Sequence, residues 1–124
     1  MAQQPVVSII DDDISEREAL STLVRSLGYA ARTFDSAESF LDSHCLAETA
    51  CIVSDVHMPG MSGLDLQDQL RANGNTVPMV FITGFPEEHL RVRAEAGGAL
   101  GFLSKPFDRH MIARLLVAAI GQMF

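Results

Sequence analysis

The chain has 124 residues, 48% of them hydrophobic, which suits one globular domain with its own core, so we expect a single domain over residues 1–124. Its formal net charge of −7 at pH 7 argues against unaided nucleic-acid binding, which needs a basic face. The segment Met1–Pro5 lacks a basic stretch, and the apolar run after it has only the length of a strand. Both features argue against a signal peptide or a membrane span. We therefore expect a cytoplasmic protein.

The first half of the chain alternates strand and helix patterns. The apolar run Val6–Ile10 predicts a strand, and a helix-spaced apolar stripe follows and stops at Gly28. The residues of this stripe are Ala19, Leu20, Leu23, Val24 and Leu27. Tyr29–Phe34 is predicted to be the second strand. Asp35 and Glu38 form a capping-box pattern, which predicts that a short helix opens there.

The second half continues the alternation. Ser62 and Asp65 form another capping-box pattern, and a further helix is predicted from Pro86 with its acidic first turn to the stop at Gly97. Three apolar runs predict strands: Cys51–Ser54, Met79–Ile82 and Gly101–Ser104. A last helix carries the stripe Met111, Ile112, Leu115, Leu116, Ala119 and Ile120. Five strands alternating with five helices predict an α/β fold, a doubly wound parallel sheet with right-handed crossovers.

Reactive side chains follow four of the five predicted strands. They are Asp11, Asp12, Asp55, Thr83 and Lys105. Ligands bind outside the carboxyl ends of the strands in open α/β sheets, so we expect these groups to converge although they are far apart in sequence. Three carboxylates, a hydroxyl and an ammonium suit a divalent cation together with a phosphoryl group. The plainer interpretation, a polar turn, is disfavoured because three adjacent like charges suit a single helix cap poorly.

The two cysteines are too few for a disulfide framework, and both are expected to be reduced. Cys51 lies in a predicted buried strand and Cys45 at the end of a predicted helix. A metal site built from these cysteines with His44 and His57 lacks close paired-ligand spacing, so ordinary packing is the better interpretation.

Four motifs in this order resemble the receiver domain of two-component response regulators. They are Ile9-Ile10-Asp11-Asp12-Asp13, Asp55-Val56-His57-Met58-Pro59-Gly60-Met61-Ser62-Gly63, Ile82-Thr83-Gly84 and Lys105-Pro106-Phe107. The resemblance covers essentially the whole chain. The amino-acid sequence of Phe102–Asp108 is most similar to that of receivers of nitrogen-fixation-type regulators. It implies one receiver domain over residues 1–124 with a flavodoxin-like fold and strand order 2-1-3-4-5.

The resemblance also implies a metal-dependent phosphoacceptor. Asp55 would accept the phosphoryl group. Mg²⁺ would be bound directly by Asp12, through water by Asp11, and by Asp55 and the backbone carbonyl of His57, a modest oxygen set of the kind that Mg²⁺ takes. Asp13 is expected to be a solvated loop residue without a role.

Further residues would handle the phosphoryl group and transmit the signal. Lys105 would pair with one phosphoryl oxygen, and the hydroxyl of Thr83 would donate to another. Phe102 would follow Thr83 inward as a switch, an interpretation preferred over simple packing because end strands tend to be half exposed. In the family the Lys105–Pro106 peptide bond is typically cis, so a cis bond is expected. Phe85 would either exclude water from the site or pack on the following helix.

The implied partner is a sensor histidine kinase or a phosphotransfer protein. Phosphorylation would switch the face made by the fourth helix, fifth strand and fifth helix, through which a homodimer is possible. The chain would catalyse only its own phosphorylation and dephosphorylation, and it would contact neither nucleic acid nor membrane.

Two other functions compete with this one. A phosphatase of the haloacid dehalogenase type would use Asp11 as nucleophile and Asp13 as acid/base, with Thr83 in its second motif. The chain has no acidic pair directly after a later strand to hold the metal and no cap insertion for such an enzyme, and Asp55 would be unexplained. A pseudo-receiver that only binds proteins would typically lose some of the five groups, and all five are present.

Overall fold

The computed structural model describes residues 4–121, and its centre is a five-stranded parallel sheet. The strands are β1 (Val6–Ile10), β2 (Ala30–Phe34), β3 (Thr49–Asp55), β4 (Met79–Thr83) and β5 (Gly101–Ser104). Their order in the sheet is β2-β1-β3-β4-β5, and all neighbouring pairs are parallel. The predicted fold class and strand order are therefore confirmed.

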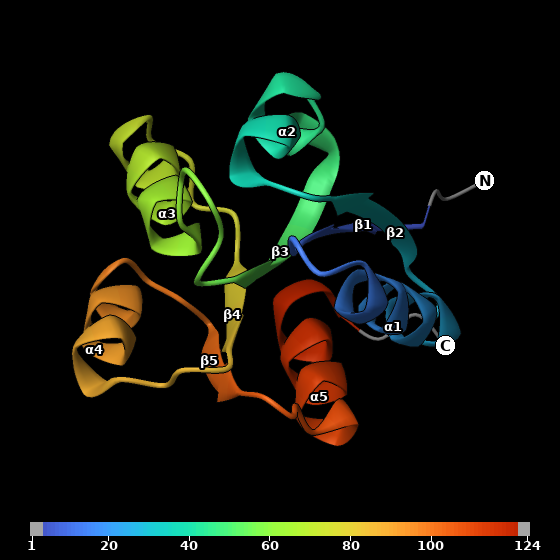
Figure 1. Ribbon diagram of the computed structural model, residues 1–124. Helices are drawn as coiled ribbons and strands as arrows, with labels where there is room; N and C mark the ends of the chain where they lie inside the picture. Colours follow the sequence, from blue (N-terminus) through green and yellow to red (C-terminus); the bar gives the residue numbers. More distant parts are fainter. Residues whose placement is uncertain (1–3, 122–124) are drawn as a thin grey trace.

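Four α-helices connect these strands and a fifth follows β5, and together they cover both faces of the sheet (Figure 1). They are α1 (Ile14–Ser26), α2 (Ala37–Asp42), α3 (Gly63–Ala72), α4 (Glu88–Ala96) and α5 (Arg109–Ile120), and a short 3₁₀ helix, Leu46–Glu48, precedes β3. Helices α1 and α5 lie on one side of the sheet, whereas α2, α3 and α4 lie on the other. Among residues 4–121, no helix has the length and apolar character needed to cross a bilayer.

Alternate residues of the central strands supply two separate cores. In β3, Cys51 and Val53 pack toward α1 and α5, while Ile52 between them packs toward α2, α3 and α4. β4 follows the same rule, with Val80 on the first side and Phe81 on the second. Side chains alternate across a strand, so a strand buried on both faces consists almost entirely of apolar residues. The continuous apolar runs in the sequence reflect this arrangement.

The predicted ends of α1 and α4 and the predicted start of α3 are confirmed, and the predicted start of α2 is wrong. Gly28 has a φ of 96° just after α1, and the reciprocal capping box of Ser62 and Asp65 opens α3. In α2, however, Ser36 and not Asp35 caps the helix, since its side chain accepts a hydrogen bond from Ser39 N. The expected partner Glu38 instead accepts the backbone N–H of Met61 at 3.0 Å, in the loop before α3.

Three smaller expectations also need correction. Asp13 is not a free loop residue, because it caps α1 and accepts the backbone N–H of Glu16 at 3.0 Å. Cys45 does not end a helix; α2 ends at Asp42, and Cys45 precedes the 3₁₀ helix. Pro86 lies before the N-cap residue of α4, Glu87, rather than in its first turn.

Candidate functional site

Three carboxylates gather at the carboxyl edge of the sheet. Asp11 and Asp12 follow β1, Asp55 ends β3, and each offers an oxygen within 4.8 Å of the other two. Asp11 and Asp55 are only 1% and 7% exposed, whereas Asp12 is open to solvent. Hard oxygen ligands of this kind suit Mg²⁺, which takes a few carboxylates and keeps several waters. The fold thus brings together the three carboxylates of the predicted metal site.

Asp55 is held in place by its neighbours in the chain. The hydroxyl of Ser54 donates to the Asp55 carbonyl at 2.8 Å, and the backbone N–H of His57 donates to Asp55 Oδ1 at 3.2 Å. Gly63, the first residue of α3, passes so close that a Cβ there would lie 2.3 Å from the Asp55 carbonyl oxygen. The orientation of this carboxylate is therefore set by the turn between β3 and α3.

Lys105 brings the only ammonium group that contacts the described carboxylates of this cluster. Its Nζ lies 3.0 Å from Asp55 Oδ2 and 3.7 Å from Asp11 Oδ2. Its backbone N–H donates to the Thr83 carbonyl at 2.8 Å, which ties the loop after β5 to the end of β4. The Lys105–Pro106 peptide bond is cis, as expected from the sequence.

Glu16 is a member of the site that the sequence analysis missed. It lies in the first turn of α1, and its carboxylate forms an ion pair with Lys105 Nζ. Asp13 and Glu16 have the spacing of a capping box, a sequence signal that locates the start of a helix. That signal predicts no contact with a lysine that follows β5, so the Glu16–Lys105 ion pair can be recognised only in the tertiary structure.

The electrostatics of the site follow from burial and crowding. Burial raises the pKa of Asp11 to about 7; the bond from Asp13 N opposes this rise, while Glu16 and Asp55 add to it. For Lys105, burial would lower the pKa, but the bonds to Glu16 and Asp55 outweigh burial and raise it. A lysine that stays charged beside several carboxylates can neutralise a further anionic group that approaches Asp55.

Thr83 and Phe102, the predicted switch residues, lie on adjacent strands. Thr83 is buried at the end of β4, and its hydroxyl oxygen accepts the backbone N–H of Phe85 at 3.0 Å. Phe102 is half-buried and packs against the core formed with α2, α3 and α4. The structure thus shows the hydroxyl of Thr83 engaged with backbone and not with the carboxylates.

Two aromatic rings mark the rim of the site. The rings of His57 and Phe85 meet edge to face with centroids 5.9 Å apart, and Phe85 is 71% exposed. The His57 side chain is exposed as well. Phe85 contacts a ring from the loop after β3.

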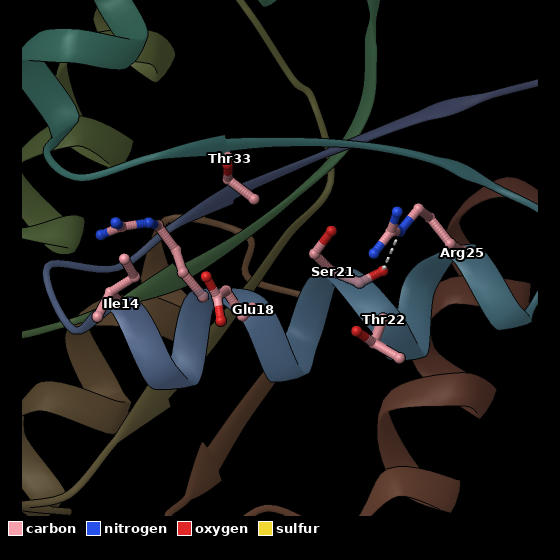
Figure 2. A pocket seen from close by; sticks show the side chains of 7 residues that line it. Ile14, Glu18, Ser21, Thr22, Arg25 and Thr33 are labelled. Atoms are coloured by element: carbon pink, nitrogen blue, oxygen red, sulfur yellow. Dashed lines mark hydrogen bonds between the residues drawn. The ribbon is translucent and has the colours of Figure 1, made fainter.

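A separate hollow of about 490 Å³ runs along α1 beside β2 (Figure 2). Its lining residues are Ile14, Arg17, Glu18, Ser21, Thr22, Arg25 and Thr33. It contains none of the five groups predicted from the strand ends. The carboxylate cluster lies outside this hollow, at the carboxyl ends of β1 and β3.

Comparisons with known proteins agree with one another. A family model described as the response regulator receiver domain matches residues 7–117. Nodulation protein W of Bradyrhizobium diazoefficiens is 43% identical over 114 residues, which cover 92% of this chain and 50% of that protein. Transcriptional regulatory protein FixJ of Azorhizobium caulinodans is 40% identical over 122 residues, 98% of this chain and 58% of that protein. The chain spans about half the length of the curated relatives it matches.

Solved structures show the same architecture. The structure of response regulator StyR superposes with a TM-score of 0.87 at 41% identity and covers 94% of this chain and 59% of that one. The structure of FixJ-N superposes with a TM-score of 0.83 at 31% identity, over 95% of this chain and 94% of that one.

Proposed function

Because the chain belongs to the family of response regulator receiver domains, the phosphoacceptor signalling domains of two-component systems, we propose that Asp55 is its phosphoacceptor. One observation carries this assignment. The Asp55 carboxylate lies 3.0 Å from Lys105 Nζ and in the same carboxylate cluster as Asp11 and Asp12. A nucleophile, a cation partner and metal ligands therefore stand at one point, within one receiver domain over residues 1–124.

The proposed step is a phosphoryl transfer from a phosphohistidine. An Asp55 carboxylate oxygen attacks phosphorus, an O–P bond forms and the P–N bond to the imidazole breaks. The imidazole nitrogen keeps the electron pair of that bond and takes up a proton. Such transfers depend mainly on positioning and charge stabilisation, which Lys105 provides at one phosphoryl oxygen. The hydroxyl of Thr83 would reach another oxygen after leaving the Phe85 N–H.

The residues present fit a Mg²⁺ ion. Asp12 would bind it directly, Asp11 through water, and Asp55 and the backbone carbonyl of His57 would complete the protein's share. Two of these carboxylates are buried close together with a single ammonium between them, an arrangement that a divalent cation stabilises. When bound, Mg²⁺ would neutralise charge on Asp55 and on the phosphoryl oxygens. The chain's own residues supply the nucleophile and hold it in place.

The proposed signal is a change in the face made by α4, β5 and α5. Phosphorylation adds about −1.5 to −2 charge at Asp55, and Thr83 moves toward it while Phe102 follows. The proposed partners are a sensor histidine kinase or a phosphotransfer protein, in the cytoplasm, and a second copy bound through that face. The chain itself would act on no other substrate.

The competing phosphatase interpretation is not supported. The family match and the relatives are response regulators, and none of the reported proteins is a haloacid dehalogenase. Asp13, which that mechanism needs as its acid/base, caps α1.

The test is to incubate the protein with Mg²⁺ and acetyl phosphate. One phosphoryl group should appear on Asp55 as an acyl phosphate that is stable in acid and lost in base, located by mass spectrometry of peptides. Asp55→Asn should abolish it. Asp42→Asn, which removes a charge from an exposed site on α2, should label like the wild type.

Label on Asp11 that survives Asp55→Asn would contradict the assignment. Complete absence of label from the folded wild-type protein, with Mg²⁺ bound, would favour a pseudo-receiver instead.

A further inference from the structure

Glu16 occupies a position that none of the assigned roles explains. Its carboxylate pairs with Lys105 Nζ, which also lies 3.0 Å from Asp55 Oδ2. The Lys105 side chain is 20% exposed and that of Glu16 34%, so the pair is partly shielded from solvent. Lys105 therefore bridges two carboxylates, one of which is the proposed phosphoacceptor.

Helix capping does not account for the Glu16 side chain. In a capping box the Glu at this position would accept the backbone N–H of the N-cap residue. Here that N–H, from Asp13, donates to Asp11 Oδ1 at 2.9 Å instead. Glu16 takes part in capping α1 only through its backbone N–H, which donates to the Asp13 side chain. The carboxylate of Glu16 instead pairs with Lys105 and lies beside Asp11.

The charge of Glu16 matters for an anion that arrives at Asp55. An ammonium has three donors, and Glu16 and Asp55 each take one. A phosphoryl group on Asp55 must share Lys105 with Glu16, and like charges held by one cation repel each other. A metal ion in the cluster would experience the opposite effect, because a nearby carboxylate attracts a cation.

We propose that Glu16 is a positioning residue that holds Lys105 beside Asp55 and, through its negative charge, disfavours the phosphoryl group on Asp55. The inference rests on the proposed roles of Asp55 and Lys105. During transfer from acetyl phosphate, the Asp55 O–P bond forms, the P–O bond to acetate breaks, and acetate leaves with the electron pair. Glu16 neither gains nor loses a proton in this step.

Glu16→Gln tests the proposal, because the amide oxygen can still accept a hydrogen bond from Lys105 while the charge is gone. The control is Glu18→Gln, which removes one charge from the exposed face of the same helix, beside the hollow in Figure 2. Beryllofluoride, a phosphoryl analogue, is titrated at saturating Mg²⁺, and Mg²⁺ is titrated alone, both by calorimetry. Labelling of Asp55 by acetyl phosphate is followed in parallel.

Relative to Glu18→Gln, Glu16→Gln should bind beryllofluoride about threefold tighter or more, a typical factor for one partly exposed charge pair. It should label faster and bind Mg²⁺ more weakly. These opposite shifts distinguish a charge effect from damage to the site, which would weaken both ligands. If the two variants behave alike, or if Glu16→Gln binds both beryllofluoride and Mg²⁺ more weakly, the inference about Glu16 is overturned while the proposed function stands. A wild-type protein that labels elsewhere than Asp55 would overturn the proposed function as well.

Discussion

Asp11 shows how strongly a single residue in the site is affected by its surroundings. It is 1% exposed, and its pKa is raised from the ordinary value of 3.8 to about 7, first by burial and then by neighbouring carboxylates. In the unfolded chain its pKa is near the ordinary value. Between pH 4 and 7 the folded protein therefore binds more protons than the unfolded chain. The contribution of Asp11 to the free energy of unfolding therefore falls as the pH rises through this window.

Asp11→Asn should remove this part of the pH dependence. The amide keeps an oxygen for the Asp13 N–H, but it cannot ionise. Without metal at pH 8, the variant should be more stable than the wild type by about 1 kcal/mol or more, since one unit of pKa shift corresponds to about 1.4 kcal/mol. Urea unfolding at several pH values measures this difference. Asp42→Asn serves as control, and a variant less stable than the wild type at pH 8 would refute the argument.

At the scale of elements, the start of α3 is packed directly against the end of β3. A Cβ on Gly63 would lie 2.3 Å from the Asp55 carbonyl oxygen, 2.9 Å from Ser54 Oγ and 3.2 Å from a ring carbon of Phe81. The first of these is backbone, which cannot rotate away. Glycine at this position is what allows α3 to begin next to Asp55, the proposed phosphoacceptor.

Gly63→Ala should therefore damage both stability and chemistry. Overpacking of this kind costs about 1–3 kcal/mol, and relief requires a shift of Asp55 itself. Urea unfolding should show the loss, and acetyl phosphate should label the folded variant more slowly. For stability, Gly84→Ala is the matched control, since its Cβ would meet only Lys105 Cδ at 3.9 Å. A Gly63→Ala protein with wild-type stability and labelling would contradict this packing argument.

Helix α4 buries little apolar surface and makes several polar contacts with α3. Ala94 is its only buried residue among those described. Gln67 of α3 donates to the Ala94 carbonyl at 3.0 Å, and Arg93 reaches across to Asp65 and Asp68. Elements with few buried apolar contacts open easily. The proposed signalling face thus includes a helix whose position depends on its contacts with α3.

Arg93→Gln should loosen α4 without unfolding the domain. Exposed ion pairs are worth about 0.2–1 kcal/mol and weaken in salt, so the loss should be of that size at low ionic strength and fade near 1 M salt. Amide hydrogen exchange should rise within residues 88–96. Arg91→Gln, which breaks pairs only within α4, should leave the contact with α3 intact. Faster exchange spread over the whole sheet would argue against a local attachment.

For the whole molecule, we expect the carboxylate cluster to couple Mg²⁺ binding to folding. Asp11, Asp12 and Asp55 repel one another in the folded state, and a ligand that binds only the folded state stabilises it. Mg²⁺ should therefore raise the melting temperature. Asp12→Ala should melt about 2 °C or more above the wild type without metal and lose the Mg²⁺ response. Asp42→Ala should keep that response. An Asp12→Ala protein that melts lower and still responds to millimolar Mg²⁺ would contradict the cluster.

The sequence alone determined the architecture and the positions of the main polar groups. Apolar runs in β1, β3 and β4 are buried on both faces, so their composition is dictated by the sheet and can be recognised without coordinates. Polar residues at the ends of parallel strands must meet at one edge. For the same reason the meeting of Asp11, Asp12, Asp55 and Lys105 could be expected from the strand pattern.

Only the tertiary structure decided which partner each side chain takes. Glu16 and Glu38 both have the spacing of capping-box residues, yet Glu16 pairs with Lys105 and Glu38 accepts the Met61 N–H. Each partner is distant in sequence: Lys105 lies 89 residues from Glu16 and Met61 lies 23 residues from Glu38. A local pattern gives the position of a helix end, but a carboxylate bonds whichever donor the folded chain brings within reach.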